Sequence, residues 1–368
     1  MKKLKVIISG GGTGGHIFPA IAIANALKSV HKEIEFLFVG AEGRMEMEKV
    51  PAAGYKIEGL WISGFQRRLT WSNLMFPFKV IASLSKAKKI LKAFQPDIAI
   101  GTGGYASGPM LQVAANSGIP TIIQEQNSFP GVTNKILGSK VSKICVAYEG
   151  MEKYFPKEKI VVTGNPVRND ITDLGGKRPE ALRFFGLDSN KKTILVIGGS
   201  LGARTINESI EKSLAEIVSN NIQLVWQTGK AYFPKAQEAV KKYKTDGIKA
   251  FEFISKMDLA YAAADIVVSR AGAISLSELA VAGKACILVP SPNVAEDHQT
   301  KNAMTLVKND AALMVNDNEA LEKLGKEIIV LISNGTMRAQ LERNIRKLAL
   351  PDAAERIAGE ILDLIRNK

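Results

Sequence analysis

Residues 4–16 read LKVIISGGGTGGH and residues 193–203 read TILVIGGSLGA, and these two stretches decide the fold. Each is an apolar strand followed by a glycine-rich turn and the start of a helical pattern. Glycine lets the backbone approach a ligand closely, and the first turn of a helix presents unpaired N–H groups with a partial positive charge. Two such turns predict two α/β domains that face one anionic ligand.

Apolar runs alternate with helical patterns along both halves of the chain. In the first half we expect strands near 4–9, 34–39, 97–101, 120–124 and 142–146, and helices near 16–30, 43–52, 73–94, 106–117 and 130–138. In the second half we expect strands near 193–197, 222–226, 265–268 and 285–289, helices near 203–219, 231–244, 274–282 and 296–308, and a helical tail over 319–368. The alternation predicts two Rossmann-like domains with parallel sheets that face a central cleft, as a length of 368 residues suggests.

Composition excludes several classes of protein. No apolar run approaches the roughly 20 residues that cross a bilayer, and the chain enters a strand without a signal peptide, which predicts a cytoplasmic protein. Cys145 and Cys286 fall in expected buried strands, as reduced core thiols do. With His16, His31 and His298 as the three histidines, the sequence offers no metal-ligand cluster, and no metal is expected.

The net charge of +13 at pH 7 is strongly positive, and basic residues concentrate in one stretch. Residues 59–96 hold seven lysines and arginines and no acidic residue, with aromatic and aliphatic residues between them. Such a balance fits a nucleic acid, an anionic membrane surface or a phosphorylated substrate. Because the sequence shows no recognised nucleic-acid-binding module, nucleic acid is not expected as a partner.

His16 follows the first glycine turn and opens the expected helix. A histidine at a helix N-terminus is disfavoured as a cation, so its neutral ring can take a proton or donate to an oxyanion; the alternative is a histidine that only caps the helix. Gly10, Gly12 and Gly15 also match the dinucleotide-binding spacing, but the acidic residue expected about 20 positions later is absent. A dehydrogenase is therefore disfavoured.

Polar residues follow two more strands of the first half, where loops carry function. Gly104 and Tyr105 come after the strand near 97–101, and Glu125 and Asn127 end and follow the next one. Asn127 offers a donor and an acceptor to a sugar or an amide, and Glu125 is a candidate base or acceptor. Taken alone, ordinary loop polarity explains either residue equally well.

In the second half, residues 269–278 read SRAGAISLSE after an apolar strand. Gly272 permits a turn, a hydroxyl can cap the helix, and Glu278 follows in its first turns. A carboxylate there suits a ribose diol, because it can accept both hydroxyl protons. A capping interaction between Ser275 and Glu278 is the structural alternative.

Two further side chains suit a nucleotide sugar. Arg168 lies in the linker between the two halves, and guanidinium pairs bidentately with phosphate oxygens. Gln299 opens another helix of the second half and can address sugar hydroxyls.

Six motifs follow one another along the chain: GGTGGH at 11–16, GGY at 103–105, EQN at 125–127, GNPVR at 164–168, GGSLGA at 198–203 and SE at 277–278. Together they closely resemble the bacterial MurG family of glycosyltransferases. The resemblance that they carry extends from about residue 5 to residue 360. That family transfers N-acetylglucosamine from UDP-GlcNAc to the C4 hydroxyl of MurNAc-pentapeptide-diphospho-undecaprenol (lipid I), with inversion, and so forms lipid II for peptidoglycan.

The resemblance implies an α/β fold of the GT-B type. Its domains would be residues 1–165, which bind the acceptor and the membrane, residues 166–350, which bind UDP-GlcNAc, and residues 351–368, a helix that packs back on the first domain. No cofactor is implied. The sequence lacks an Asp-x-Asp triplet for a metal-held nucleotide sugar, and helix N-termini with Arg168 can stabilise the leaving diphosphate instead.

The resemblance also implies roles for individual residues. His16 and Glu125 would be catalytic, with His16 the first choice as the base that deprotonates the acceptor hydroxyl, although it could instead bind the diphosphate. Gly104 and Tyr105 would contact the acceptor. Contacts to UDP-GlcNAc would come from Thr13, Gly14, Gly15, Asn127, Arg168, Ser200, Ile254, Ala273, Ile274, Ser275, Leu276, Ser277, Glu278 and Gln299. Leu201 departs from the family, which commonly has glutamine there.

The lipid acceptor gives the basic stretch a role. Helical spacing puts Lys79, Lys86 and Lys89 near one side of a helix whose other side holds Leu74, Phe78, Ile81 and Leu84. Each lysine near an anionic surface contributes on the order of 1 kcal/mol, which predicts peripheral attachment to the cytoplasmic side of the cell membrane. A solvated basic face over a core helix is the alternative. The expected partners are UDP-GlcNAc, lipid I, the anionic membrane surface and other cell-wall synthesis proteins.

Two other enzymes share the expected fold. A GT-B transferase that glycosylates diacylglycerol would carry similar glycine turns. A UDP-sugar 2-epimerase would need several more carboxylates in the cleft than this sequence offers.

Overall fold

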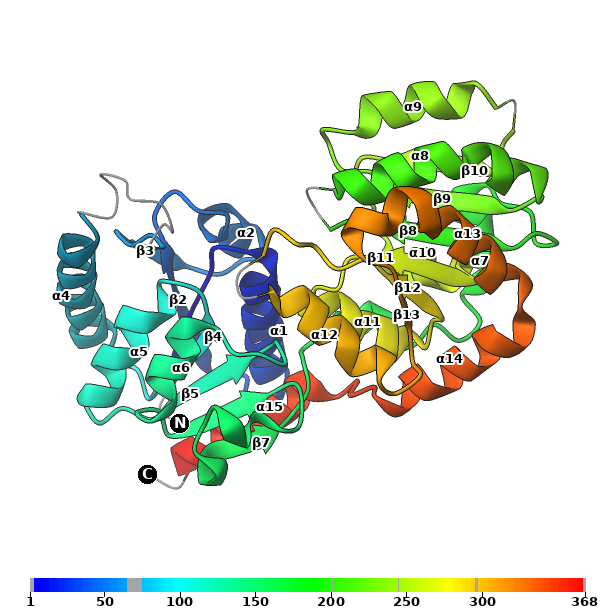
Figure 1. Cartoon of the computed structure of the whole chain (residues 1–368). Coiled ribbons are helices and arrows are strands. Elements are labelled where there is room, and N and C mark those ends of the chain that lie inside the picture. The colour runs from blue at the N-terminus through cyan, green and yellow to red at the C-terminus, as the bar shows by residue number, and fades with distance from the viewer. Residues whose placement is uncertain (1–2, 65–74, 200–201, 244, 295–296, 367–368) are drawn as a thin grey trace. The chain divides into compact units, whose positions relative to one another are not determined.

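The computed structural model describes residues 3–64, 75–199, 202–243, 245–294 and 297–366 (Figure 1). The chain divides into two compact units. The N-terminal unit comprises Met1–Val167 and Pro351–Lys368, and the C-terminal unit comprises Arg168–Leu350.

The N-terminal unit is built on a parallel seven-stranded sheet in the order β3-β2-β1-β4-β5-β6-β7. Its strands are β1 (Leu4–Gly10), β2 (Ile34–Ala41), β3 (Ile57–Leu60), β4 (Ile98–Gly103), β5 (Thr121–Glu125), β6 (Lys143–Val146) and β7 (Ile160–Val162). Its helices are α1 (Gly14–Val30), α2 (Glu46–Ala52), α4 (Phe76–Phe94), α5 (Ser107–Asn116), α6 (Val132–Gly138) and α15 (Ala353–Arg366).

Both faces of this sheet are covered, which explains why its central strands are almost continuously apolar. Along β1, Val6 and Ile8 face one cluster, which α1, α2 and α15 complete. Ile7 faces the opposite cluster, which α4, α5 and α6 complete. The alternation follows from the two-residue period of a strand.

The C-terminal unit repeats the plan with a parallel six-stranded sheet in the order β10-β9-β8-β11-β12-β13. Its strands are β8 (Thr193–Ile197), β9 (Gln223–Gln227), β10 (Ile248–Phe251), β11 (Ile266–Ser269), β12 (Cys286–Leu288) and β13 (Leu313–Met314). Its helices are α7 (Arg178–Phe185), α8 (Arg204–Ser219), α9 (Phe233–Lys241), α10 (Met257–Ala263), α11 (Ala273–Ala282), α12 (His298–Val307), α13 (Ala320–Ser333) and α14 (Gly335–Lys347). Cys145 and Cys286 are both free thiols in buried strands.

The last helix of the chain belongs to the first unit. α15 packs against α1 (Figure 1), and its residues Ala354, Ile357, Ala358 and Ile361 are buried in the cluster that also holds Val6 and Ile8. The spacing of three and four residues is that of one helix face. Lys143 of β6 forms an ion pair with Glu360 on the same helix.

The main strands and helices lie where the sequence predicts them, within a few residues. The short elements β3, β7, β10, β13, α7 and α10 fall outside the expected set. One difference affects the site: α1 begins at Gly14, so His16 is the third residue of the helix and not the first.

Candidate functional site

The first glycine turn lies against a second glycine pair after β4. A Cβ on Gly10 would lie 2.0 Å from Thr102 Oγ1, and one on Gly104, whose φ is +85°, would lie 2.3 Å from the carbonyl oxygen of Gly11. The N–H of Gly11 donates to the carbonyl of Gly103 at 3.2 Å. Two backbones this close leave no room for side chains, so both turns require glycine.

His16 is held by this paired turn. Its Nδ1 lies 2.9 Å from the carbonyl oxygen of Gly11 and 3.3 Å from Thr13 Oγ1. A carbonyl oxygen only accepts, so Nδ1 carries the hydrogen and, in the neutral ring, Nε2 keeps its lone pair. A Cβ on Gly103 would lie 3.0 Å from Nε2, so glycine there leaves room for the ring. Thr102 Oγ1 donates to the carbonyl of His16 at 2.9 Å and fixes the helix.

Thr13, Gly14 and Gly15 form the start of α1 with their backbone groups. Thr13 is the N-cap of α1 and forms no side-chain capping bond, and Thr13 and Gly15 are exposed while Gly14 is half-buried. The first turn of α1 contains no acidic residue. The partial positive charge of this helix start therefore suits an electronegative group. The His16 ring lies beside it and bonds to the Gly11 carbonyl.

Glu125 is buried at the end of β5, and four donors of its own loop surround its carboxylate. The backbone N–H and the side-chain amide of Asn127 donate to Oε1 at 3.0 and 3.1 Å. The N–H of Gly131 and Nδ2 of Asn134 donate to Oε2 at 3.1 and 2.8 Å. These bonds fill the lone-pair directions of a carboxylate, so Glu125 fixes the loop that carries Asn127.

A buried amide network joins this loop to the end of the N-terminal unit. Gln126 Nε2 donates to the carbonyl of Thr102 at 2.8 Å, and Gln124 Nε2 donates to Asn165 Oδ1 at 2.9 Å. Asn165 Nδ2 donates in turn to the carbonyl of Gln126 at 3.0 Å. The sequence shows that polar residues stand at the ends of buried strands, but it does not show which of these side chains bond to one another.

The second glycine turn, after β8, is equally tight. Gly202 has a φ of +80°, and a Cβ there would lie 2.1 Å from the carbonyl oxygen of Thr228. Ser200 and Leu201, at the tip of the turn, lie outside the described residues.

Gln227, for which the sequence motifs predict no role, supports the second turn. Its Nε2 donates to the carbonyl of Gly199 at 3.1 Å, and its Oε1 accepts from the N–H of Ile254 at 2.8 Å. One buried side chain therefore sets the position of the turn relative to Ile254, a residue expected to contact the donor. The available signal was a glutamine that ends the apolar strand QLVWQ.

Helix α11 begins at Ala273 after the N-cap Gly272, with no side-chain capping bond. The first helical bond joins the N–H of Leu276 to the carbonyl of Gly272 at 3.0 Å. Ser277 Oγ donates to the carbonyl of Ala273 at 3.1 Å. The N–H groups of the first turn, from Ala273, Ile274 and Ser275, are thus suited to an anion.

Glu278 does not cap this helix with Ser275; it turns toward Arg168 and Tyr261. The Arg168 Nε lies 3.7 Å from its Oε1, and the Tyr261 hydroxyl donates to its Oε2 at 3.2 Å. Burial raises the pKa of the Glu278 carboxyl to about 7, because Arg168 and the Tyr261 hydroxyl only partly offset the loss of water.

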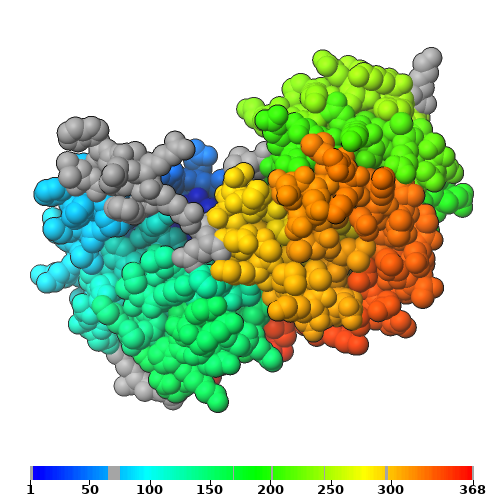
Figure 2. Space-filling model, viewed as in Figure 1, coloured from blue at the N-terminus to red at the C-terminus, as the bar shows by residue number. Residues whose placement is uncertain are grey.

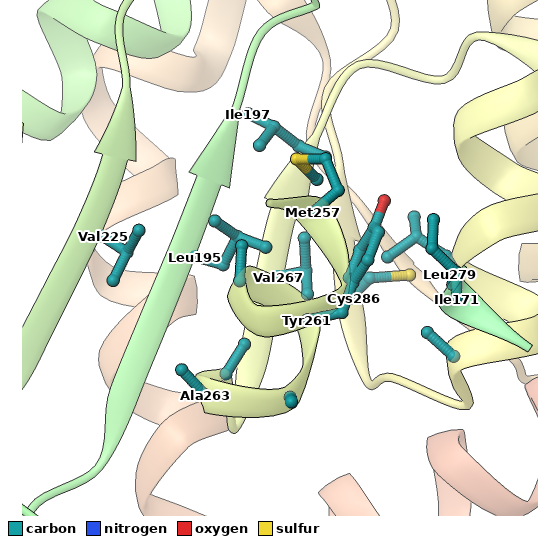
Figure 3. Close-up of a cluster of buried hydrophobic side chains, with 14 of the residues drawn as sticks. Ile171, Leu195, Ile197, Val225, Met257, Tyr261, Ala263, Val267, Leu279 and Cys286 are labelled. Atoms are coloured by element: carbon teal, nitrogen blue, oxygen red, sulfur yellow. The ribbon is translucent and has the colours of Figure 1, made fainter. Parts of the chain in front are cut away.

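Tyr261 anchors this group in the core. Figure 3 shows its ring among Met257, Leu279 and Cys286, with the hydroxyl as the polar tip. Burial, and then the charge of Glu278, raises the pKa of the Tyr261 hydroxyl well above its usual value. The hydroxyl therefore stays protonated and remains a donor to the carboxylate.

Gln299 and Arg270 hold the loop after β12. Gln299 Oε1 accepts from the N–H of Ser291 at 2.8 Å. Arg270 forms an ion pair with Asp317 and donates to the carbonyls of Val289 and Pro290 at 3.0 and 3.2 Å. Gln299 therefore positions the backbone of this loop, and Arg270 supports the same loop although no motif predicted a role for it.

Helix α4 lies at the surface of the N-terminal unit, where its light-blue surface is visible in Figure 2. The side facing the sheet carries Ser83, Ala87, Ile90 and Leu91. Phe78 and Ile81 are 62% and 66% exposed, on the outward side. The expectation that these two residues lie opposite Lys89 is wrong, because a period of 3.6 residues puts Phe78 and Lys89 on one face.

The other residues of this surface are partly engaged within the unit. Lys79 donates to Ser63 Oγ at 2.9 Å and lies over the Trp61 ring, and Lys86 pairs with Glu42 at 2.9 Å. Tyr105 is half exposed, and its ring occupies the space that a Cβ on Gly64 would need. Leu74 lies outside the described residues.

Among the described residues, no helix has the length and apolar character to span a membrane. The same residues contain no group of three or more histidine, cysteine, aspartate and glutamate side chains that could hold a metal ion.

Both units match known domains. Residues 6–146 match the glycosyltransferase family 28 N-terminal domain, and residues 193–357 match the glycosyltransferase family 28 C-terminal domain. The two glycine turns lie one in each matched range. These matches define the class of protein: a family 28 glycosyltransferase.

Full-length relatives narrow the class. A Cytophaga hutchinsonii protein named UDP-N-acetylglucosamine--N-acetylmuramyl-(pentapeptide) pyrophosphoryl-undecaprenol N-acetylglucosamine transferase is 58% identical over 364 residues, 99% of this chain and 98% of the relative. A Parabacteroides distasonis protein of the same name is 55% identical over the full length of both chains. The crystal structure of Acinetobacter baumannii MurG shares a TM-score of 0.79 at 27% identity and covers 99% of this chain and 100% of that one.

The chain belongs to the MurG family. The resemblance seen in the sequence motifs is confirmed, and so is the α/β fold of the GT-B type with two parallel sheets.

Proposed function

We propose that this protein transfers N-acetylglucosamine from UDP-GlcNAc to the C4 hydroxyl of lipid I, with inversion, and so forms lipid II. The observation that carries the proposal is 58% identity, over nearly the whole chain, to a relative named for this transfer. The chemistry of both units supports it, since one holds a histidine as a proton acceptor and the other offers a helix start, an arginine and a carboxylate.

His16 is proposed as the base. Its Nδ1 is bonded to the Gly11 carbonyl, so Nε2 of the neutral ring is the atom that takes the proton from the acceptor hydroxyl. We assign Glu125 to positioning, because its two oxygens accept four donors from the Asn127 loop. Gly104 and Tyr105 are proposed acceptor contacts.

The C-terminal unit is proposed to bind the donor. The α11 start and Arg168 suit the diphosphate, whose charge grows as the glycosidic bond breaks. Glu278 suits the ribose hydroxyls, with Tyr261 holding one of its oxygens. Ser200, Ile254, Ser277 and Gln299 complete the proposed donor contacts of this unit. Thr13, Gly14, Gly15 and Asn127 are the donor contacts proposed for the N-terminal unit.

The test is a transfer assay with labelled UDP-GlcNAc and a lipid I analogue, without added metal. We expect labelled lipid II, and no product with diacylglycerol as the acceptor. Transfer to diacylglycerol without transfer to lipid I would overturn the proposal in favour of a different GT-B enzyme.

We propose further that the protein attaches peripherally to the cytoplasmic side of the cell membrane through α4. Phe78 and Ile81 share its outward side with Lys88 and Lys89, so apolar and basic groups are presented together. Flotation with anionic liposomes should show weaker binding for Lys88→Glu/Lys89→Glu than for the control Lys212→Glu, an exposed lysine of α8. Equal partition of the two variants would contradict membrane docking by this face.

A further inference from the structure

We propose that Glu46 is a positioning residue that acts on His16 through the peptide group between Gly11 and Gly12. The N–H of that peptide group donates to Glu46 Oε2 at 2.9 Å, and its carbonyl oxygen lies 2.9 Å from His16 Nδ1. One planar amide thus connects a carboxylate to the imidazole. The consequence for catalysis rests on the proposed role of His16 as the base.

The Glu46 side chain has a prepared place behind the turn. It is fully buried, and its Oε1 accepts from the N–H of Ala41 at 2.9 Å. A Cβ on Gly11 would lie 2.1 Å from Oε1, and one on Gly40 would lie 2.5 Å from the Glu46 Cγ. Glycine at both positions leaves the space that the Glu46 side chain fills, so the contact depends on Gly11 and Gly40.

The physical effect follows from the polarity of an amide. A carboxylate that accepts from the N–H increases the negative charge on the carbonyl oxygen of the same peptide, because hydrogen bonds in a chain polarise one another. The Gly11 carbonyl then holds the Nδ1 hydrogen more strongly. This keeps the lone pair on Nε2 and stabilises the ring once it has taken a proton, against the unfavourable field of the α1 N-terminus.

Among the described residues, Glu46 is the charged side chain that bonds to the Gly11–Gly12 peptide group. Around the turn, β1 contributes Ser9 and Gly10, β4 ends in uncharged residues, and Gly14–Ala20 of α1 holds no charged residue besides His16. Glu42, after β2, pairs with Lys86. On α15, which packs on α1, charges occur in the pairs Asp352–Arg356, Glu360–Lys143 and Asp363–Arg366, with Glu355 exposed.

The test is ¹⁵N NMR of the imidazole rings in the full chain. The sequence has three histidines, so a His16→Gln spectrum identifies the His16 signals. In the wild-type protein we expect neutral His16 to carry its hydrogen on Nδ1. In Glu46→Gln we expect a shift toward the Nε2–H form and a His16 pKa lower by about one unit. The control Glu48→Gln, an exposed residue of the same helix, should change neither.

Kinetics separate this proposal from the proposed function. We expect Glu46→Gln to lower kcat about tenfold, with the KM for UDP-GlcNAc within about twofold, and Glu46→Asp, which keeps the charge, to recover part of the loss. A wild-type ring with its hydrogen on Nε2, or ring signals that Glu46→Gln leaves unchanged, would overturn the action of Glu46. A changed ring with an unchanged kcat would uphold that action and overturn His16 as the base. The wild-type spectrum decides the first point even if Glu46→Gln does not fold.

Discussion

The two glycine turns have similar sequences and are supported in opposite ways. In the first turn, the buried carboxylate of Glu46 accepts the N–H of Gly12, so a backbone donor that could bind an anion is already used. In the second turn, Gln227 donates to the carbonyl of Gly199, so the support takes an acceptor instead of a donor. The two supports therefore differ in kind: the first uses a backbone donor of its turn, and the second uses a backbone acceptor.

The largest effect should be the loss of kcat when His16, which follows the first turn, is replaced. His16→Gln keeps a side chain that can donate to the Gly11 carbonyl but removes the proton acceptor, so kcat should fall by about 10²- to 10⁴-fold. Affinity for UDP should stay close to wild type by calorimetry. A kcat within threefold of wild type would rule out His16 as the proton acceptor.

Close backbone contact in each turn predicts a large loss of stability. Gly104→Ala and Gly202→Ala add a Cβ 2.3 Å and 2.1 Å from a carbonyl oxygen at positive φ, so each should cost roughly 2–4 kcal/mol by chemical denaturation. We expect the first variant to lower kcat and the second to raise the KM for UDP-GlcNAc. Gly54→Ala and Gly176→Ala are the controls, because their φ is positive but nothing lies within 4 Å. Equal losses in controls and variants would show that contact is not the cause.

The buried carboxyl group of Glu278 predicts a pH dependence of stability in the C-terminal unit. The pKa of Glu278 is raised from an ordinary value near 4.5 to about 7, so the folded state binds this proton more tightly. Its contribution to stability is therefore lost as pH rises from about 4.5 to 7, by up to roughly 3 kcal/mol, and is constant above. Glu278→Gln should unfold at a higher temperature than wild type at pH 8 but not at pH 5, by calorimetry. The exposed-site control Glu216→Gln should show no such crossing.

The smallest effect should come from loosening the second turn. Gln227→Leu removes the bonds to Gly199 and Ile254, which should weaken UDP binding by about 1–2 kcal/mol and leave kcat nearly unchanged. Titration calorimetry measures the affinity, with the exposed Gln237→Leu as the control. A fall in kcat without a loss of affinity would mean that this support serves the reaction and not donor binding.

The sequence predicted those parts of the fold in which a local pattern has one solution. Long apolar strands next to glycine turns identified both sheets. The edge strands β3, β7 and β13 were missed because two to four residues give too little periodicity, and edge residues are partly exposed. The expected separation of basic and apolar sides on α4 was also wrong, because Phe78 and Lys89 share one face. Small residues such as Ser83 and Ala87 pack on the sheet there, while Phe78 and Ile81 face outward.

The site was predictable only to the level of single residues. His16 and Glu278 come after strand ends and Arg168 lies in the linker, so each could be singled out as a candidate. The groups that surround them could not, because Glu46 contacts Gly12, 34 residues away in sequence, and Tyr261 contacts Glu278, 17 residues away, and neither has a motif of its own. The partners of such buried polar groups can be identified only from the folded structure, because residues far apart in the sequence form the bonds.

The return of α15 to the first unit has a consequence for biosynthesis. Residues 353–366 supply apolar side chains to the N-terminal core, so that core is incomplete until α15 has left the ribosome. The C-terminal unit, Arg168–Leu350, is finished earlier although it comes second in the sequence. During synthesis, the side of α1 that packs against α15 therefore stays uncovered until a helix more than 300 residues downstream has been made.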